Sequence, residues 1–246
     1  MKDTKSQKVR TMKLYGKSTS SGQLTIKSRA YFSINHLLGA YHFSKLAGER
    51  EEKFDGNITN DIIQRIYVIN SILSATAFLE ATINEFYQDA YDGDHNESGK
   101  LNQNVISLLS DFWEMTEKEN KSPLSILDKY QMALLFARKE PFSKGENPYQ
   151  DAALVVKVRN YLTHFKPMTL DENNKHPLES KLITRFDPNK MMEGSENNFF
   201  PDKALGVGCA EWSLKSVKNF ADEFFQRMGI KPNYQVVDMD KLAGKK

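Results

Sequence analysis

The chain has 246 residues and carries 34 lysines and arginines against 32 aspartates and glutamates, for a formal net charge of +2. This length allows one large domain or two small ones, with enough apolar material for a substantial core. The near balance of charge argues against a strongly basic nucleic-acid scaffold and against an acidic tail protein. Cys209 is the single cysteine, which excludes an intrachain disulfide and a zinc site built from several thiolates.

The apolar segments of the sequence indicate where in the cell the protein is expected. No apolar run stands out as long enough to cross a membrane, and the lysine-rich N-terminus is not followed by the apolar segment of a signal peptide. We therefore expect a cytoplasmic protein with no membrane partner.

The N-terminal segment, residues 1–29, is basic. Eight lysines and arginines fall within residues 1–30, against the single acidic residue Asp3. Two short half-apolar runs, Val9–Tyr15 and Gln23–Ser28, flank a turn-rich loop and predict a small β-hairpin. Such a basic arm could bind RNA phosphates, or it could be a solvated arm without a partner.

From residue 30 onward the apolar residues recur at spacings of three and four, which predicts a mainly α protein. We expect a single helical domain over residues 30–230, folded as an antiparallel bundle because most connections are short. In the longest helix, a stripe of eight residues is expected to face the core: Ile62, Ile66, Ile69, Leu73, Leu79, Ile83, Phe86 and Ala90. Ser122-Pro123 is expected to cap the helix that ends before Pro141. The longest helix is predicted over Asn60–Tyr91, and the other predicted helices are Ala30–Arg50, Asn104–Glu119, Asp151–Pro167 and Glu211–Met228.

Two segments lack helical periodicity. Met168–Leu205 is predicted to be a long irregular insertion, and loops of this length are usually functional or disordered, so we expect a lid or rim beside a site. Within it, Leu182–Phe186 is expected to form a short strand against the N-terminal hairpin. Gly229 should end the last helix in a left-handed conformation, and residues 231–246 are expected to form a loose tail.

The helix Asp151–Pro167 carries the candidate functional residues. It begins after Asn147-Pro148, a favourable helix start, and Pro167 is expected to end it. Its predicted buried stripe is Leu154, Val158, Tyr161 and Phe165. On the edge of this stripe, Asn160 and His164 are four residues apart and share a face. Arg159 lies about 100° around the helix, and its long side chain can swing to the same place.

The sequence Arg159-Asn160-Tyr161-Leu162-Thr163-His164 resembles the R-x4–6-H motif of HEPN domains. These are small α-helical bundles, many of which are metal-independent endoribonucleases. In that family the residue after the arginine is usually polar, and here it is Asn160. Ala77–Glu85 is similar, more loosely, to the second-helix pattern of several HEPN-like proteins. The resemblance covers about Thr59–Gly229 and implies a HEPN-like bundle.

The resemblance also implies a reaction, in which the ribose 2′-hydroxyl attacks the adjacent phosphate without a metal or other cofactor. His164 would be the general acid or base, Arg159 the phosphate clamp and Asn160 the group that orients them. Glu80 would orient Arg159 or His164 across the bundle, and Lys166 would add a phosphate contact. The implied partners are the RNA substrate, a second copy of the chain that completes a composite active site, and an antitoxin or defence-system protein.

A catalytically silent alternative remains open. Arginine and histidine near a helix C-terminus interact favourably with the helix dipole and with the last carbonyl groups. Arg159 and His164 would then be structural, and the chain would be a helical module that binds RNA or protein.

Overall fold

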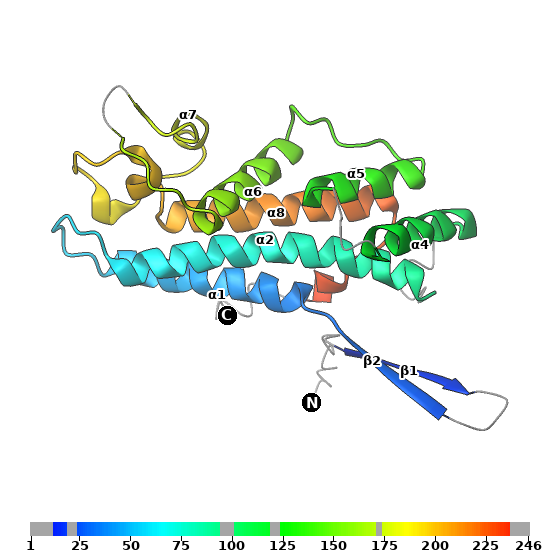
Figure 1. Ribbon diagram of the computed structural model, residues 1–246. Helices are drawn as coiled ribbons and strands as arrows, with labels where there is room; N and C mark the ends of the chain where they lie inside the picture. The colour runs from blue at the N-terminus through cyan, green and yellow to red at the C-terminus, as the bar shows by residue number, and fades with distance from the viewer. Residues whose placement is uncertain (1–11, 19–23, 94–100, 119–123, 171–173, 237–246) are drawn as a thin grey trace, which may run out of the picture.

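We describe the fold from a computed structural model that covers residues 12–18, 24–93, 101–118, 124–170 and 174–236. The architecture is a bundle of long helices from which a two-stranded ribbon extends (Figure 1). The long helices are α1 (Ser33–Glu52), α2 (Ile62–Tyr91), α4 (Gln103–Lys118), α5 (Ile126–Phe136), α6 (Tyr149–Thr163) and α8 (Val207–Met228). The short elements are β1 (Met12–Ser18), β2 (Leu24–Ala30), α7 (Glu179–Leu182), η1 (Lys190–Met192), η2 (Phe199–Lys203) and η3 (Asn233–Val236).

Helix α2 is the spine of the bundle. It runs beside α1 along most of its length and also packs against α4, α5, α6 and α8 (Figure 1). Its start is fixed by Asp61, whose carboxylate accepts a hydrogen bond from the backbone N–H of Gln64 at 2.9 Å. Its C-terminal half is lined by fully buried side chains such as Phe78, Leu79 and Ile83. The mainly helical bundle predicted from the sequence is therefore confirmed.

The N-terminal half of α2 presents a different face to the core from the one predicted. Val68 and Ile72 are fully buried, whereas Ile62 is 72% exposed and Ile66 is 44% exposed. Ile69 and Leu73, which continue the stripe of Ile62 and Ile66, are only half-buried. The predicted core stripe is thus wrong over this half of the helix, whereas its continuation through Leu79, Ile83, Phe86 and Ala90 is buried. This part of the helix carries apolar residues on most of its circumference, so their spacing alone cannot say which side is covered.

The composition of α2 also corrects an expectation about membranes. Within the described residues it is the one helix that is long and apolar enough to cross a membrane, although we expected no such run. Half of its apolar window is buried inside the bundle. The core helix of a helical bundle meets the same criteria of length and composition.

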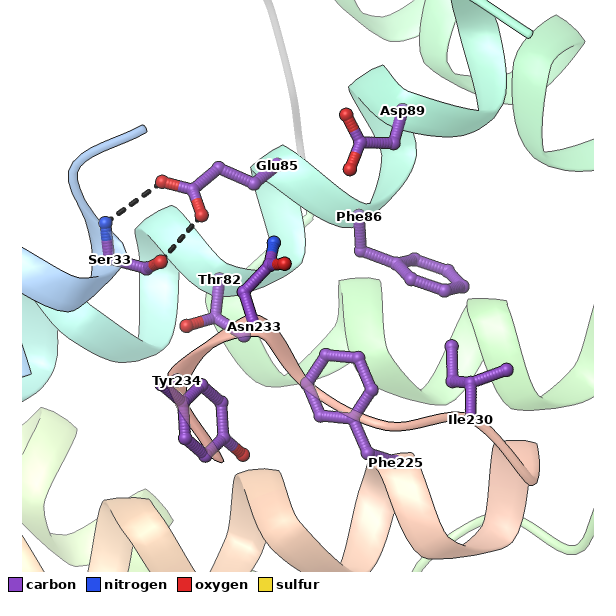
Figure 2. Close-up of a pocket in the computed structure, with 9 residues that line it drawn as sticks. All are labelled: Ser33, Thr82, Glu85, Phe86, Asp89, Phe225, Ile230, Asn233 and Tyr234. Atoms are coloured by element: carbon purple, nitrogen blue, oxygen red, sulfur yellow. Dashed lines mark hydrogen bonds between the residues drawn. The ribbon is translucent and has the colours of Figure 1, made fainter. Parts of the chain in front are cut away.

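Helix α1 begins without a side-chain cap of its own, and Glu85 of α2 supplies one. The Glu85 carboxylate accepts hydrogen bonds from the backbone N–H groups of Phe32 and Ser33 at 2.7 and 2.8 Å and from the Ser33 hydroxyl at 2.5 Å. Figure 2 shows the contacts with Ser33 at the edge of a small cavity of about 30 Å³. Desolvation by burial raises the pKa of Glu85, while these hydrogen bonds oppose the rise.

Helix α8 is capped in the same indirect way. Its N-cap residue is Gly206, and the carboxylate of Glu51 on α1 accepts a hydrogen bond from the Val207 N–H at 2.6 Å. The same carboxylate oxygen accepts from the Gln64 amide of α2 at 2.7 Å. Helix α8 therefore starts at Val207 instead of Glu211. It ends, as predicted, at Gly229, which has a left-handed φ of 72°.

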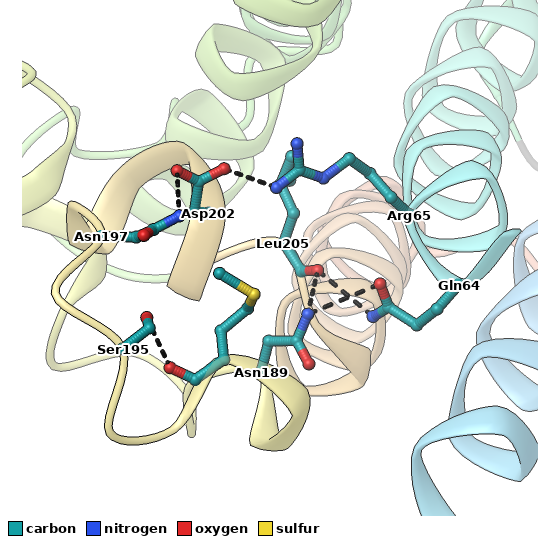
Figure 3. Close-up of polar contacts among 8 residues, drawn as sticks. Gln64, Arg65, Asn189, Ser195, Asn197, Asp202 and Leu205 are labelled. Carbon is teal, nitrogen blue, oxygen red and sulfur yellow. Dashed lines mark hydrogen bonds and ion pairs between the residues drawn. The ribbon is translucent and has the colours of Figure 1, made fainter. Parts of the chain in front are cut away.

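The insertion before α8 is anchored to α2 and is not a strand. Leu182, the first residue of the predicted strand, ends the short helix α7, and the chain then turns. Figure 3 shows the anchor, in which the Gln64 and Asn189 amides both donate to the carbonyl oxygen of Leu205 at 3.2 Å. Arg65 also pairs with Asp202 at 2.5 Å.

Two glycines allow the insertion to approach the start of α8. A Cβ atom on Gly206 would lie 2.6 Å from Cα of Asn189, and one on Gly208 would lie 2.5 Å from the carbonyl oxygen of Asp187. Both contacts are with backbone, which cannot move aside as a side chain can. Gly206-Val207-Gly208 is thus a site of close packing.

The remaining boundaries refine the predictions. Helix α5 is capped by Ser125, whose hydroxyl accepts from the Asp128 N–H at 3.2 Å, whereas the predicted cap at Ser122-Pro123 lies outside the described residues. Tyr234, in a segment expected to be loose, is only 3% exposed and packs edge-on against Phe78. Residues 237–246 lie outside the described part of the chain.

The N-terminal strands β1 and β2 pair antiparallel, with Met12 opposite Ala30 and Ser18 opposite Leu24. The ribbon projects away from the helices in Figure 1. Arg29 joins its base to the end of α2, since its guanidinium pairs with Asp89 at 3.1 Å and also with Asp92. Val9, at the start of the first predicted strand, lies outside the described residues.

The glycine contact predicts the effect of a single methyl group. Gly206→Ala should lower the free energy of unfolding by about 1–3 kcal/mol, because the new Cβ must push the backbone of Asn189 away. Urea unfolding followed by circular dichroism measures the loss. Gly145→Ala is the matched control, since a Cβ there meets nothing within 4 Å. Equal stability of the two variants would contradict the packing described.

The buried cap of α1 predicts a dependence on pH. The pKa of Glu85 is higher in the folded than in the unfolded protein. The contribution of Glu85 to the free energy of unfolding is therefore fully present below the unfolded-state pKa of about 4.5, and it is lost as the pH rises through the folded-state pKa. The unfolding free energy of the parent, taken relative to Glu85→Gln, should therefore fall as the pH is raised from below about 4.5 into the range above it. Urea titrations of both proteins across this range test the sign, and a difference that grows with pH would refute it.

Candidate functional site

Helix α6 ends earlier than its sequence pattern predicts. Its last helical residue is Thr163, and His164 leaves helical geometry with φ −107° and ψ 41°. The prediction that Pro167 ends the helix is therefore wrong by one turn. At the other end, the Asn147 side chain accepts a hydrogen bond from the Asp151 N–H at 3.2 Å, while Pro148 occupies the N-cap position.

Arg159 points towards the spine of the bundle. Its side chain is 23% exposed, and its Nη2 lies 3.8 Å from Oε2 of Glu80 on α2. Glu80 was expected to lie beside Arg159 or His164, and the structure places it beside Arg159. At this distance, and with Glu80 48% exposed, the pair is a weak one that solvent screens. The Nε atom of Arg159 is buried and has no hydrogen-bond partner among the described residues.

Asn160 in the last turn of α6 and His164, the residue directly after the helix, are both exposed. The His164 N–H donates to the Asn160 carbonyl oxygen at 2.9 Å, which keeps the two residues one turn apart on the same face. Lys166, two residues further on, is also exposed. Within the described part of the chain, no hydrogen bond joins the side chains of Arg159, Asn160 and His164. The motif therefore consists of an open imidazole and amide with a guanidinium held to one side.

Phe165 departs furthest from its predicted place. It was expected to complete the buried stripe of α6, yet it is 56% exposed. Because the helix ends at Thr163, the residues beyond it no longer follow the helical stripe. Its ring packs edge-on against Tyr161, with centroids 5.6 Å apart and an interplanar angle of 85°. The early end of the helix therefore moves an aromatic ring next to His164 into solvent.

The insertion packs against this end of α6 through Tyr161. The Tyr161 ring lies 4.6 Å from the ring of His176 and 5.0 Å from that of Phe200. His176 is 6% exposed, and its Nδ1 accepts a hydrogen bond from the Leu178 N–H at 3.1 Å. Burial lowers the pKa of His176, and Glu179 opposes the change. A neutral, buried imidazole thus helps to fix the insertion, a role that its sequence context did not reveal.

The other candidate sites offer less chemistry. Helices α1 and α8 line an open groove of about 700 Å³, to which Lys45, Lys215 and Lys218 contribute positive charges and Glu49, Glu52 and Glu211 negative ones. Because the groove carries charges of both signs, it favours neither an anionic nor a cationic ligand. Across the described ranges, no group of three or more histidine, cysteine, aspartate or glutamate side chains could hold a metal ion. The end of α6 is the place where an exposed imidazole, an amide and a guanidinium come from one turn of helix.

Comparison with known proteins adds no relative that could assign this site. No family model, no curated protein and no solved structure matches the chain.

Proposed function

We propose that this chain is a metal-independent endoribonuclease of the HEPN type, with its active site at the C-terminal end of α6. The observation that carries the proposal is the exposed His164, with Asn160 one turn before it and Arg159 beside them. Imidazole is the side chain best suited to move protons near neutral pH. Guanidinium matches the geometry and the charge of a phosphate.

In the proposed reaction, the imidazole of His164 accepts the proton of the ribose 2′-hydroxyl. The 2′-oxygen then forms a bond to the adjacent phosphorus, and the bond from phosphorus to the 5′-oxygen breaks. The leaving oxygen takes up a proton, giving a 2′,3′-cyclic phosphate and a 5′-hydroxyl. Arg159 stabilises the negative charge that accumulates on the phosphorane, which is the role that positioned cations fill in such reactions.

The weak contact with Glu80 suits this role for Arg159. At 3.8 Å, and with Glu80 48% exposed, the pair holds the guanidinium beside α2 only weakly. A phosphate that arrives at His164 can therefore compete for it. Asn160 is placed on the same face as His164 and can hydrogen-bond the imidazole or the phosphate, and Lys166 adds positive charge nearby.

We further propose that the active form is a homodimer. One protomer carries one such imidazole, whereas the reaction needs one group that accepts a proton and one that donates it. The stripe of exposed Ile62 and Ile66, continued by half-buried Ile69 and Leu73, supplies an apolar surface for a second copy. Glu80 follows Ile62 by about five whole turns, so the stripe leads along one side of α2 to the Arg159 contact.

The alternative is a catalytically silent helical module, and one observation favours it. Arg159 is three-quarters buried and already contacts Glu80, as a structural arginine would. Under the nuclease proposal, by contrast, the natural role is a toxin or antiviral effector that cleaves RNA in its own cell, with an antitoxin or defence partner that controls it. The variants below separate the two candidates.

The nuclease proposal predicts that RNA cleavage depends on the motif. Purified protein incubated with total cellular RNA and a metal chelator should yield fragments with cyclic phosphate ends. His164→Ala and Arg159→Ala should each lower the cleavage rate at least about a hundredfold, since a positioned acid–base group contributes about 10²–10⁴-fold. Gel electrophoresis and end-group analysis measure the products.

Matched variants separate catalysis from folding. His42→Ala removes an exposed histidine from α1, and Arg65→Ala removes a half-buried, ion-paired arginine from α2. Both should cleave at the parent rate, and all four variants should keep the parent's circular dichroism spectrum. If His164→Ala and Arg159→Ala cleave as fast as the parent, the chain is not a nuclease of this type.

The dimer proposal predicts a charge-sensitive interface. Ile66→Asp should convert the protein to a monomer and abolish cleavage, because a carboxylate would be buried between two apolar helices. Leu108→Asp is the control, since Leu108 is 47% exposed on α4, close to the 44% of Ile66. Light scattering after gel filtration reports the mass. A parent that is monomeric at all concentrations and still cleaves would refute the dimer.

A further inference from the structure

We propose that Phe165 is a base-stacking residue, which makes unpaired RNA the substrate class of the α6 site. This inference rests on the proposed nuclease function and adds what that proposal leaves open. It starts from the exposure of the ring. Phe165 directly follows His164 and leaves 56% of its surface open to solvent, whereas large apolar side chains are usually buried.

The ring of Phe165 is held in place from one side. Its contact with Tyr161 has centroids 5.6 Å apart and an interplanar angle of 85°, so the two rings meet edge to face. Tyr161 in turn packs edge-on against His176 and Phe200, which are 6% and 0% exposed. The exposed ring is therefore supported by a row of rings that ends in the core. An exposed aromatic ring with such support loses little conformational freedom when a ligand stacks on it.

The neighbours of Phe165 provide the rest of a nucleotide-binding surface. Lys166 follows it in the chain, Lys157 lies on α6, and both lysines are exposed. Cations that contact the backbone beside an aromatic platform for the bases are the usual means of binding single-stranded nucleic acid. With the scissile phosphate at His164, the adjoining nucleotide has Phe165 beside it.

A stacking residue at this place excludes paired RNA. The bases of an A-form helix are stacked on each other and cannot also stack on a protein ring, so recognition by stacking needs a loop, a bulge or a free end. The chemistry leads to the same requirement, since in-line attack by a 2′-hydroxyl needs a backbone that can leave helical geometry. The proposed substrate is thus single-stranded RNA in which a base next to the cleaved bond is free to stack.

Binding measurements with the full chain test the role of the ring. The background is His164→Ala, which keeps the RNA intact, and the probe is a fluorescein-labelled, unstructured RNA of about 12 nucleotides. Phe165→Ala should weaken binding about tenfold, and Phe165→Leu should weaken it similarly although it keeps an apolar side chain. Phe165→Tyr should bind like the background, because it keeps the ring. Met168→Ala is the matched control, an exposed apolar residue without a ring, and should leave binding unchanged.

A spectroscopic signal separates stacking from a structural effect. With 2-aminopurine in place of single bases, the fluorescence at one position should change on binding in the presence of Phe165 and should not change with Phe165→Ala. The same RNA annealed to its complement should bind at least about tenfold more weakly than the single strand. Equal affinity for both forms, or a 2-aminopurine signal that persists in Phe165→Ala, would overturn the inference.

The outcomes distinguish this inference from the nuclease proposal. If the parent cleaves RNA and Phe165→Ala binds as tightly as the background, the stacking role is wrong and the nuclease stands. If stacking is seen but the parent never cleaves, the chain is an RNA-binding module and the nuclease proposal fails. If the ring variants impair self-association and leave RNA binding unchanged, Phe165 belongs to the dimer interface and the inference is overturned.

Discussion

Two glutamates tie the three longest helices of this protein together at their ends. Glu85 of α2 accepts the first N–H groups of α1, and Glu51 of α1 accepts the first N–H of α8. Neither α1 nor α8 has a side-chain cap of its own. The start of each helix therefore depends on the position of another helix, which fixes how far each slides along its neighbour. The position of α6, and with it the candidate site, follows from this frame because α6 packs on α2 and α8.

Helix α2 carries apolar residues in both of its halves, although the two halves are buried to different extents. Its C-terminal half is enclosed by the bundle, and its N-terminal half shows isoleucines to solvent while still burying Val68 and Ile72. A helix that is apolar on most sides folds well against any partner, but its sequence does not say which side remains free. This surplus of apolar surface supports the proposal that a second copy covers it.

The sequence predicted elements well where the signal is local. Helix periodicity and end signals such as Gly229 gave the main helices to within a few residues. Contacts between distant segments were not predictable: the cross-helix caps, the close approach of Asn189 to Gly206 and the course of the insertion all join residues far apart in the chain. The face of α2 was mispredicted for the same reason, since only the neighbours decide which isoleucines are covered.

At the candidate site, sequence spacing placed Asn160 and His164 on one face, and the family resemblance suggested Glu80 as a neighbour of Arg159 or His164. It placed Phe165 wrongly, because the position at which α6 ends is decided by the chain beyond it. Helical periodicity predicts the direction of a side chain only for residues that lie within the helix. The insertion meets the chain near this end of α6, since His176 and Phe200 pack against Tyr161.

The cap on α1 has a consequence for the order in which the chain can fold during synthesis. Its acceptor, Glu85, lies 52 residues after Ser33, so the ribosome releases the first helix well before the group that completes it. Until then the leading amides of α1 can bond only to water. The first two long helices consequently mature as one unit, and a nascent chain that stops short of residue 85 carries an α1 whose first turn is open.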